Sequence, residues 1–187
     1  MITVIKEKFK PNIPLTVQRV EPNIWRDLGF HKHHYLTASL NRSCKCLLFK
    51  WGNTPIAFVA IINQPGRYNR WGYRISRIVI LPDFQGLGLF KRIINFIGGI
   101  VKASNDEAEL YIKTIHANAG KSLERNSNWL ATNWNLKGRT KQFDEGNKYK
   151  NRLLRSSYCF KYIGEKLEGY ENLLYPIVEL RKTKQSL

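Results

Sequence analysis

One segment of the chain constrains the fold most, because a strand pattern in it runs directly into a helix pattern. Apolar residues recur over Gly72–Leu81, which predicts a strand, and a run rich in Leu, Phe and Ile over Leu87–Lys102 predicts a helix. Between them, Gly86 and Gly88 let the backbone turn tightly and leave its N–H groups unobstructed. Such amides, with the positive end of the helix dipole, form a cradle for a phosphate or pyrophosphate group. An ordinary strand-to-helix turn has the same glycines, and their spacing matches neither the GxGxxG dinucleotide motif nor the P-loop motif.

The remaining patterns alternate between strands and helices. Strands are predicted over Thr16–Val20, Lys45–Trp51, Ile56–Ile62, Glu109–Ile115 and Trp129–Leu136, with later ones over Tyr158–Gly164 and Tyr175–Leu180. Helices are predicted over Pro22–His34 and Asn118–Arg125, and the polar, aperiodic stretch Arg139–Arg152 predicts an exposed basic loop. Turn formers at 52–55 join two of the strands as a hairpin. A hairpin that leads into a strand–helix–strand unit predicts a mixed sheet with helices packed on its faces.

Length and composition indicate one globular domain over residues 1–187, because the hydrophobic share of 43% is too high for a disordered chain. No apolar run approaches the roughly 18 residues that a membrane span needs, and the N-terminus shows no apolar signal-peptide segment. Three cysteines are an odd number for a disulfide scaffold, and Cys44 and Cys46 alone supply too few ligands for a metal. We therefore expect a soluble, cytoplasmic protein without a metal or a membrane partner, in which these two thiols are free and buried.

The chain is strongly basic, with 31 Lys and Arg residues against 14 Asp and Glu residues and a net charge of +17. Lys137–Lys161 interleaves eight basic residues with tyrosine and phenylalanine. Basic groups bind phosphates and aromatic rings stack on bases, so this composition indicates a polyanionic partner, with nucleic acid among the candidates. A solvated basic face, or attraction to a nucleotide cofactor, also explains the charge.

The turn between the strand and the helix also matches a family pattern. Residues 81–90, LPDFQGLGLF, resemble the acetyl-CoA-binding motif Q/R-x-x-G-x-G/A of the GCN5-related N-acetyltransferase (GNAT) superfamily. Gln85 and Gly88 match this motif, and Phe90 stands where the family usually has Gly or Ala. The resemblance covers about Lys45–Leu136 and implies an α/β fold with a mixed, mostly antiparallel sheet, splayed central strands and flanking helices. It also implies an N-acetyltransferase that takes acetyl-CoA, or another CoA-like acyl donor, as its cofactor.

The resemblance further implies which residues bind that cofactor. The backbone of the motif strand would pair with the pantetheine arm at Ile78, Val79 and Ile80. The amides of the turn would hold the pyrophosphate, with help from a basic residue of the first helical turn: Gln85, Gly86, Leu87, Gly88, Leu89 and Phe90, with Lys91 or Arg92. Asn118, just after the next predicted strand, matches an Asn that the family often has near the cofactor.

Candidate catalytic residues follow from the need to deprotonate an amine near neutral pH. His34 and His116 are candidate bases, because histidine titrates in that range, although a packed or surface imidazole explains each of them as well. Tyr35 is a candidate general acid or acceptor-binding group. The tyrosine that the family often uses as a general acid has no counterpart here, and Glu124 stands closest to its position.

A second resemblance concerns the acceptor. Phe30–Leu36, Ser43–Lys45 and Asn128-Trp129 resemble phage and mobile-element members of the superfamily, among them the Mom-type proteins that modify adenine bases in DNA. A basic surface would attract a neutral amine carried on a polyanion, whereas a polyamine would need an acidic site. The acceptor stays open between a small amine, an amine on a protein and a base of DNA or RNA. The rival to an enzyme is a non-catalytic module that binds nucleic acid.

Overall fold

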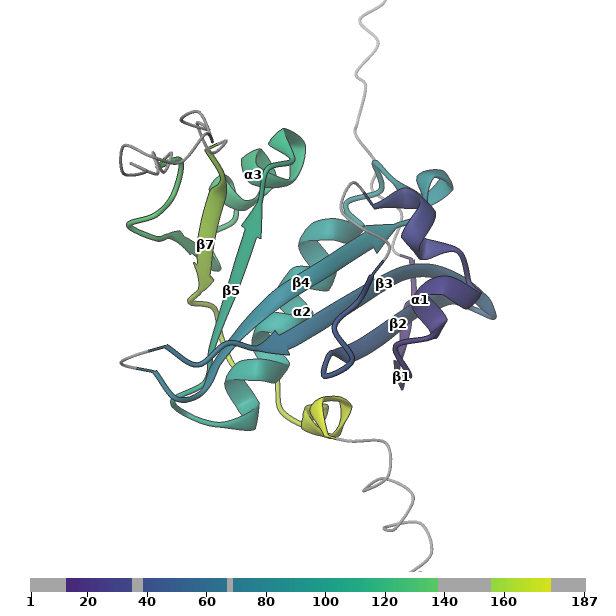
Figure 1. The fold of residues 1–187 in the computed structure, drawn as a ribbon, viewed down its shortest axis with the longest axis horizontal. Coiled ribbons are helices and arrows are strands. Elements are labelled where there is room, and N and C mark those ends of the chain that lie inside the picture. Colours follow the sequence, from purple (N-terminus) through teal and green to yellow (C-terminus); the bar gives the residue numbers. More distant parts are fainter. Residues whose placement is uncertain (1–12, 35–38, 67–68, 138–155, 176–187) are drawn as a thin grey trace, which may run out of the picture.

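The computed structural model describes residues 13–34, 39–66, 69–137 and 156–175 (Figure 1). The predicted loop Arg139–Arg152 and, apart from its first residue, the predicted strand Tyr175–Leu180 lie outside these residues. The chain forms a seven-stranded sheet in the order β1-β2-β3-β4-β5-β7-β6. The strands are β1 (Thr16–Val20), β2 (Lys45–Trp51), β3 (Thr54–Asn63), β4 (Gly72–Ile80), β5 (Glu109–Thr114), β6 (Trp129–Ala131) and β7 (Tyr158–Tyr162). Among the strands of the described residues, only β4 and β5 pair in parallel, which confirms the mixed, mostly antiparallel sheet.

One face of the sheet packs against the helix α2 (Leu89–Ser104), which lies behind the strands in Figure 1. Apolar residues recur along α2 at helical spacing, and those on the sheet side are at most 1% exposed: Leu89, Ile93, Ile94, Ile97 and Ile100. They pack against inward-facing residues of the sheet, including Leu47, Val59 and Leu110. Each such side chain contributes about 1.5–3 kcal/mol on burial, so this layer is the main core of the protein. The helix α3 (Ala117–Glu124) adds Leu123 to it.

On the other face, two short elements cover part of the sheet within the described residues, mainly over β2, β3 and β4. The short helix α1 (Ile24–Asp27) and the 3-10 turn η1 (Phe30–His33) lie over these strands. Trp25 and Phe30 are buried, and their rings lie 5.3 Å and 5.6 Å from the ring of Phe58 on β3. The prediction of one continuous helix over Pro22–His34 is wrong, because Gly29 has a φ of +72°, a left-handed conformation that ends the helix.

The predicted strand Trp129–Leu136 is also wrong beyond Ala131. The amide of Asn135 bonds the carbonyl of Thr132 at 2.9 Å, which turns the chain away from the sheet. The Asn135 side chain then accepts the amide of Cys159 on β7 at 2.8 Å, in place of a further strand residue. Asparagine makes such side-chain-to-backbone bonds readily, and they compete with strand pairing.

The three cysteines are free, and Cys44 and Cys46 are buried, as the sequence predicts. Burial raises the pKa of the Cys46 thiol to about 12, and the neighbouring Cys44 adds to the shift. Within the described part of the chain, no helix has the length and apolar character that crossing a membrane requires.

Candidate active site

The central strands β4 and β5 diverge, as the sequence resemblance implies. They pair only between Gly72–Ile75 and Glu109–Ile112. Beyond that point β4 stays paired with β3 up to Ile80, while β5 stays paired with β7 up to Thr114. Figure 1 shows the two strands separating toward their carboxyl ends. Over its last five residues, the edge of β4 that faces β5 therefore has no strand partner among the described residues.

A β-bulge marks the place where the strands separate. On β3, Ala60 lies opposite Arg77 and Ile61 lies opposite Ile75, so Ser76 is an extra residue in β4. Such a bulge bends its strand and increases the local twist. It follows directly after the last β4–β5 pair, Ile75 with Ile112. The bulge thus coincides with the start of the cleft between the two strands.

The cleft contains a cavity of about 230 Å³ between the two strands, lined by Arg74, Ile75, Ser76, Arg77, Lys113, Thr114 and Ile115. The Arg77 guanidinium donates to the carbonyl oxygen of Ser76 at 2.9 Å and to the carbonyl oxygen of Ser39 at 3.4 Å. Arg77 therefore connects the bulge to the segment that follows η1. The cleft lies between two strands and is bordered by this cationic side chain.

The turn between β4 and α2 has the geometry that its glycines predict. Gly86 and Gly88 have φ values of +83° and +77°, in the left-handed region. No side chain caps the start of α2, so the first amides of the helix are left without a side-chain acceptor. The Gln85 side chain donates to the carbonyl oxygen of Ile80 at 2.9 Å, which holds the turn against the end of β4. The arrangement suits an anion at the helix start.

The side chains of the turn divide into buried and exposed ones. Leu89 is buried in the core, so only its backbone amide can contact a ligand, whereas Phe90 is half-buried and packs against the core. Lys91 is exposed in the first turn of α2, whereas the Arg92 guanidinium donates to the carbonyl oxygen of Ile13 at 2.9 Å. Of the two basic residues, Lys91 is the one available to an anion.

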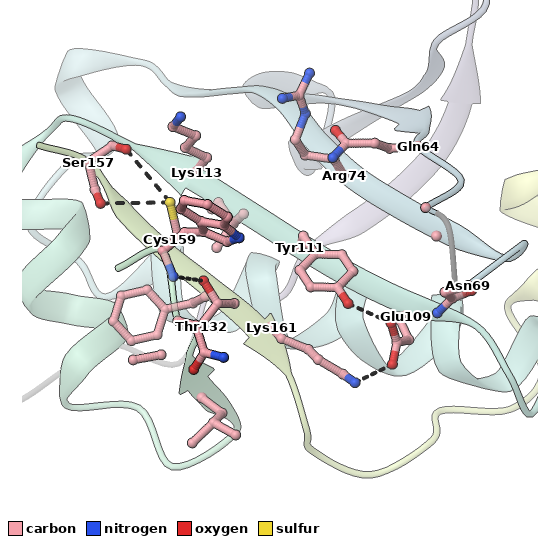
Figure 2. A pocket seen from close by; sticks show the side chains of 18 of the residues that line it. Gln64, Asn69, Arg74, Glu109, Tyr111, Lys113, Thr132, Ser157, Cys159 and Lys161 are labelled. Atoms are coloured by element: carbon pink, nitrogen blue, oxygen red, sulfur yellow. Dashed lines mark hydrogen bonds and ion pairs between the residues drawn. The ribbon is translucent and has the colours of Figure 1, made fainter. Parts of the chain in front are cut away.

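A larger groove lies on the sheet face that α1 and η1 leave uncovered. Its volume is about 1360 Å³, and its lining comes from β5, β6, β7 and the segments beside them (Figure 2). Arg74, Lys113 and Ile115 line both the groove and the cleft, so the two cavities meet at these residues. Leu130 and Trp134, which are 56% and 58% exposed, add apolar surface to the groove.

A charged network lies in the groove around Glu109. Tyr111 donates its hydroxyl to Glu109 at 2.5 Å, and Lys161 forms an ion pair with the same carboxylate (Figure 2). Burial by itself raises the pKa of Glu109, but the hydrogen bonds from Lys161 and Tyr111 hold it below its ordinary value. Burial and the bond to Glu109 raise the pKa of Tyr111 to about 12. Near neutral pH, Glu109 is charged and neutralised by Lys161, and Tyr111 is protonated.

His34 directly follows η1 as its C-cap residue. Its ring is edge-on to Trp25, with centroids 5.7 Å apart. Burial and the nearby Arg77 lower the pKa of His34 to about 4, so the imidazole is neutral near pH 7. Tyr35, the neighbouring candidate, lies outside the described residues.

The other candidates lie on α3, at the carboxyl end of β5. His116 is the N-cap of this helix, and its Nδ1 accepts the amide of Ala119 at 3.4 Å. Asn118 is exposed in the first turn, and Glu124 is exposed at the last residue of the helix. A helix of this length rises about 10 Å from its first to its last residue. His116 and Asn118 thus lie at the cleft end of α3, and Glu124 lies at the opposite end.

Several groove residues were not singled out as site residues in the sequence analysis, among them Arg74, Tyr111, Lys113 and Trp134. On β5 a signal was present, because buried Leu110 and Ile112 alternate with Glu109, Tyr111 and Lys113. Period-two alternation predicts one polar face on such a strand. Whether other elements cover that face depends on the tertiary structure, and a local sequence pattern does not show it.

Comparison with known proteins identifies the fold. No protein-family model and no curated protein match the chain. Solved structures do, among them an acetyltransferase of the GNAT family from Streptococcus pneumoniae, with 14% identity, a TM-score of 0.54 and a match over 81% of this chain and 100% of that one. Naa50 of Arabidopsis thaliana, in complex with the bisubstrate analogue CoA-Ac-MVNAL, matches with 14% identity and a TM-score of 0.54, over 79% of this chain and 97% of that one.

A third neighbour is the spermidine N-acetyltransferase from Vibrio cholerae in complex with CoA and spermine. It is 12% identical, with a TM-score of 0.53 and a match over 79% of this chain and 94% of that one. At such identities the likeness concerns the fold alone. The chain has the fold of GNAT acetyltransferases.

Proposed function

We propose that this protein is an N-acyltransferase that moves an acyl group from acyl-CoA to an amine. The observation that carries this proposal is the unpaired edge of β4, which continues into the glycine turn and the uncapped start of α2. A free strand edge binds an extended chain with amide groups, and a helix start binds a phosphate. Acyl-CoA has both parts, and two of the structural neighbours carry CoA or a CoA analogue.

The residues present fit such a donor. The backbone of Ile78, Val79 and Ile80 would bind the amide groups of the pantetheine arm, as an added strand does. The pyrophosphate would lie against the amides of the turn 85–90, with Lys91 supplying a positive charge. Asn118, at the cleft end of α3, is available as a further polar contact. The bound donor supplies an acyl group activated as a thioester.

The acceptor amine would reach the cleft from the groove, because the two cavities meet at Arg74, Lys113 and Ile115. An amine attacks a carbonyl only after losing a proton. His34 stays a prediction as the base, because its pKa of about 4 leaves it neutral near pH 7 but makes it a weak proton acceptor there. His116 uses Nδ1 for the helix cap, so its Nε2 is the atom left for proton transfer. Tyr35 and Glu124 remain predictions as acid or acceptor-binding groups.

The experiment that tests this proposal is calorimetric titration of the protein with acetyl-CoA, followed by an assay of free thiol release with a panel of amines. We expect saturable binding and a raised melting temperature, because a ligand that binds only the folded state stabilises it. The proposal fails if neither CoA nor acetyl-CoA binds.

A matched pair of glycine variants shows whether the turn is the binding site. Gly86 and Gly52 both have positive φ values, +83° and +58°, and an added Cβ meets nothing within 4 Å at either position. Alanine therefore costs about 1–2 kcal/mol of backbone strain at both sites. We expect Gly86→Ala to weaken CoA binding and Gly52→Ala, in the β2–β3 hairpin, to leave it unchanged. Equal effects of the two variants would remove the turn from the site.

Experiments on the same purified protein distinguish an acyltransferase from a non-catalytic module that binds nucleic acid. Such a module would bind DNA or RNA with a steep salt dependence, would ignore acetyl-CoA and would show no turnover. The Mom-type modification of adenine would instead appear as a mass change in DNA nucleosides that depends on an acyl-CoA donor.

A further inference from the structure

We propose that the acceptor carries an anionic group, a phosphate or a carboxylate, which Arg74 and Lys113 bind next to the reacting amine. This inference rests on the proposed function and names the class of its acceptor.

Arg74 and Lys113 flank the point at which the central strands diverge. Arg74 on β4 lies opposite Tyr111 on β5, one residue before the last pair, Ile75 with Ile112. Lys113 is the first residue of β5 beyond that pair. Both line the cleft and the groove, so an amine that enters the cleft from the groove passes between these two cations.

The side-chain donors of Arg74 and Lys113 have no partner in the part of the chain that the structure describes. The Nε of Arg74 is buried and has no hydrogen-bond partner among the described residues. Within the same residues, neither Arg74 nor Lys113 belongs to an ion pair. A buried donor without a partner costs free energy, and a guanidinium matches the two oxygens of a carboxylate or phosphate. The terminal nitrogens of Arg74 are not buried and also have no hydrogen-bond partner among the described residues, so they are the donors that an anion at this place would meet.

The acidic residues of the groove do not favour a cationic acceptor. Five cationic side chains and two acidic ones line it within the described part of the chain. Glu109 is already bound by Tyr111 and Lys161. Glu107 is exposed in the turn before β5, at the end of the strand away from the cleft. Near the cleft, the groove therefore attracts negative charge and repels a polyamine.

The test compares amines that differ by one anionic group: phosphoethanolamine with ethanolamine, adenosine monophosphate with adenosine, and a short peptide with its C-terminal amide. We expect the anionic member of at least one pair to have a KM about 10- to 100-fold lower, the ratio expected for a charge-assisted hydrogen bond. The phosphate pairs and the peptide pair separate the two sources of negative charge. Spermidine is the cationic reference and is expected to be the poorest acceptor.

Variants connect that preference to the two residues. Arg74→Gln and Lys113→Gln are expected to raise the KM for the preferred anionic acceptor about 10-fold or more and to leave the Kd for acetyl-CoA unchanged. Arg74→Lys keeps the charge but loses the planar fork and should lie in between. Arg26→Gln, on the exposed face of α1, removes one positive charge elsewhere and should have no effect. Lys113 is exposed, so its variant tests the inference even if substitution of Arg74 impairs folding.

Direct binding separates this inference from the proposed function. The same acceptors are titrated into the protein at saturating CoA, so that the phosphates of the donor already occupy their own site. If acetyl-CoA binds but neutral amines or spermidine are preferred, or if both glutamine variants match the parent, the inference is overturned and the proposed function stands. If acetyl-CoA does not bind, the proposed function fails. In that case, anion binding that is lost in Lys113→Gln would still support the anion site. Anion binding that is absent, or unchanged in Lys113→Gln, would overturn the anion site as well.

Discussion

Protonation of His34 should destabilise the folded protein between pH 6.5 and pH 4. The imidazole is half-buried, edge-on to Trp25 and close to the cationic Arg77, and its pKa is lowered from 6.5 to about 4. The unfolded chain therefore binds a proton at His34 over this range while the folded protein does not. Stability rises with pH wherever the unfolded state binds more protons, so it must fall as the pH is lowered from 6.5 to 4.

The pKa of His34 is lowered from 6.5 to about 4. At about 1.4 kcal/mol for each unit of pKa, this difference sets an upper limit of about 3.4 kcal/mol on the loss of stability. Because the side chain keeps some contact with solvent, screening reduces this contribution, and we expect roughly 1–2 kcal/mol. That is a large part of the stability of an ordinary domain, which is about 5–15 kcal/mol.

The assay is urea unfolding of the parent and of His34→Gln at several pH values between 4 and 7. The difference between the two proteins cancels the titration of the carboxylates they share. We expect the variant to lose less stability than the parent between pH 6.5 and pH 4. His33→Gln is the matched control, because His33 is exposed one residue earlier. Parallel pH profiles for the parent and His34→Gln would refute the reasoning.

Two further expectations concern the core and the thiols. Asn95 on α2 accepts hydrogen bonds from Asn126 at 2.8 Å and from the Trp129 indole at 2.9 Å. Asn95→Ala leaves these two donors without a partner and should lower the free energy of unfolding in urea by about 2–4 kcal/mol. An unchanged unfolding midpoint would show that water replaces the two bonds. Cys46 is fully buried, and its pKa is raised to about 12. It should therefore react with a thiol reagent far more slowly than Cys159, which lines the groove. Equal modification rates of the two thiols, measured by mass spectrometry of the folded protein, would contradict the burial of Cys46.

The parts of the fold that could be predicted are those with long, regular patterns. The strand predicted over Gly72–Leu81 corresponds to β4 at Gly72–Ile80, and the helix predicted over Leu87–Lys102 corresponds to α2 at Leu89–Ser104. In both, the apolar period extends over several turns or pairs, so that local pattern and burial agree. The glycine turn between them was predictable because only glycine adopts the left-handed conformation there without strain.

The errors arose where a single residue overrides a pattern. The apolar residues over Pro22–His34 have helical spacing, but Gly29 ends the helix after one turn. Beyond Ala131, the Asn135 side chain binds β7 in place of a longer strand. The bond from Cys159 to Asn135 is a tertiary contact, which a single-sequence pattern does not contain.

The candidate site was predictable in part for the same reason. The turn residues follow from a motif, whereas the groove depends on which helices cover which half of the sheet. His116 illustrates the difference: the sequence places it at the end of a strand, and the structure adds that its Nδ1 caps α3. Tyr35 stays a prediction, because it lies outside the described residues.

The extra residue at Ser76 connects these observations. In a regular strand, Arg74 and Ser76 would share one face and the pairing with β5 could continue beyond Ile75. The bulge interrupts that alternation, so Arg74 and Arg77 lie on the same face of the sheet, where Arg74 lines the groove and Arg77 reaches the carbonyl oxygen of Ser39. The extra residue thus lies where the strand edge that would bind the donor begins, just beyond the pairs that Arg74 makes with Ile62 on β3 and Tyr111 on β5. A deletion of Ser76 that restores regular pairing up to Ile80 is expected to abolish donor binding and the preference for an anionic acceptor together.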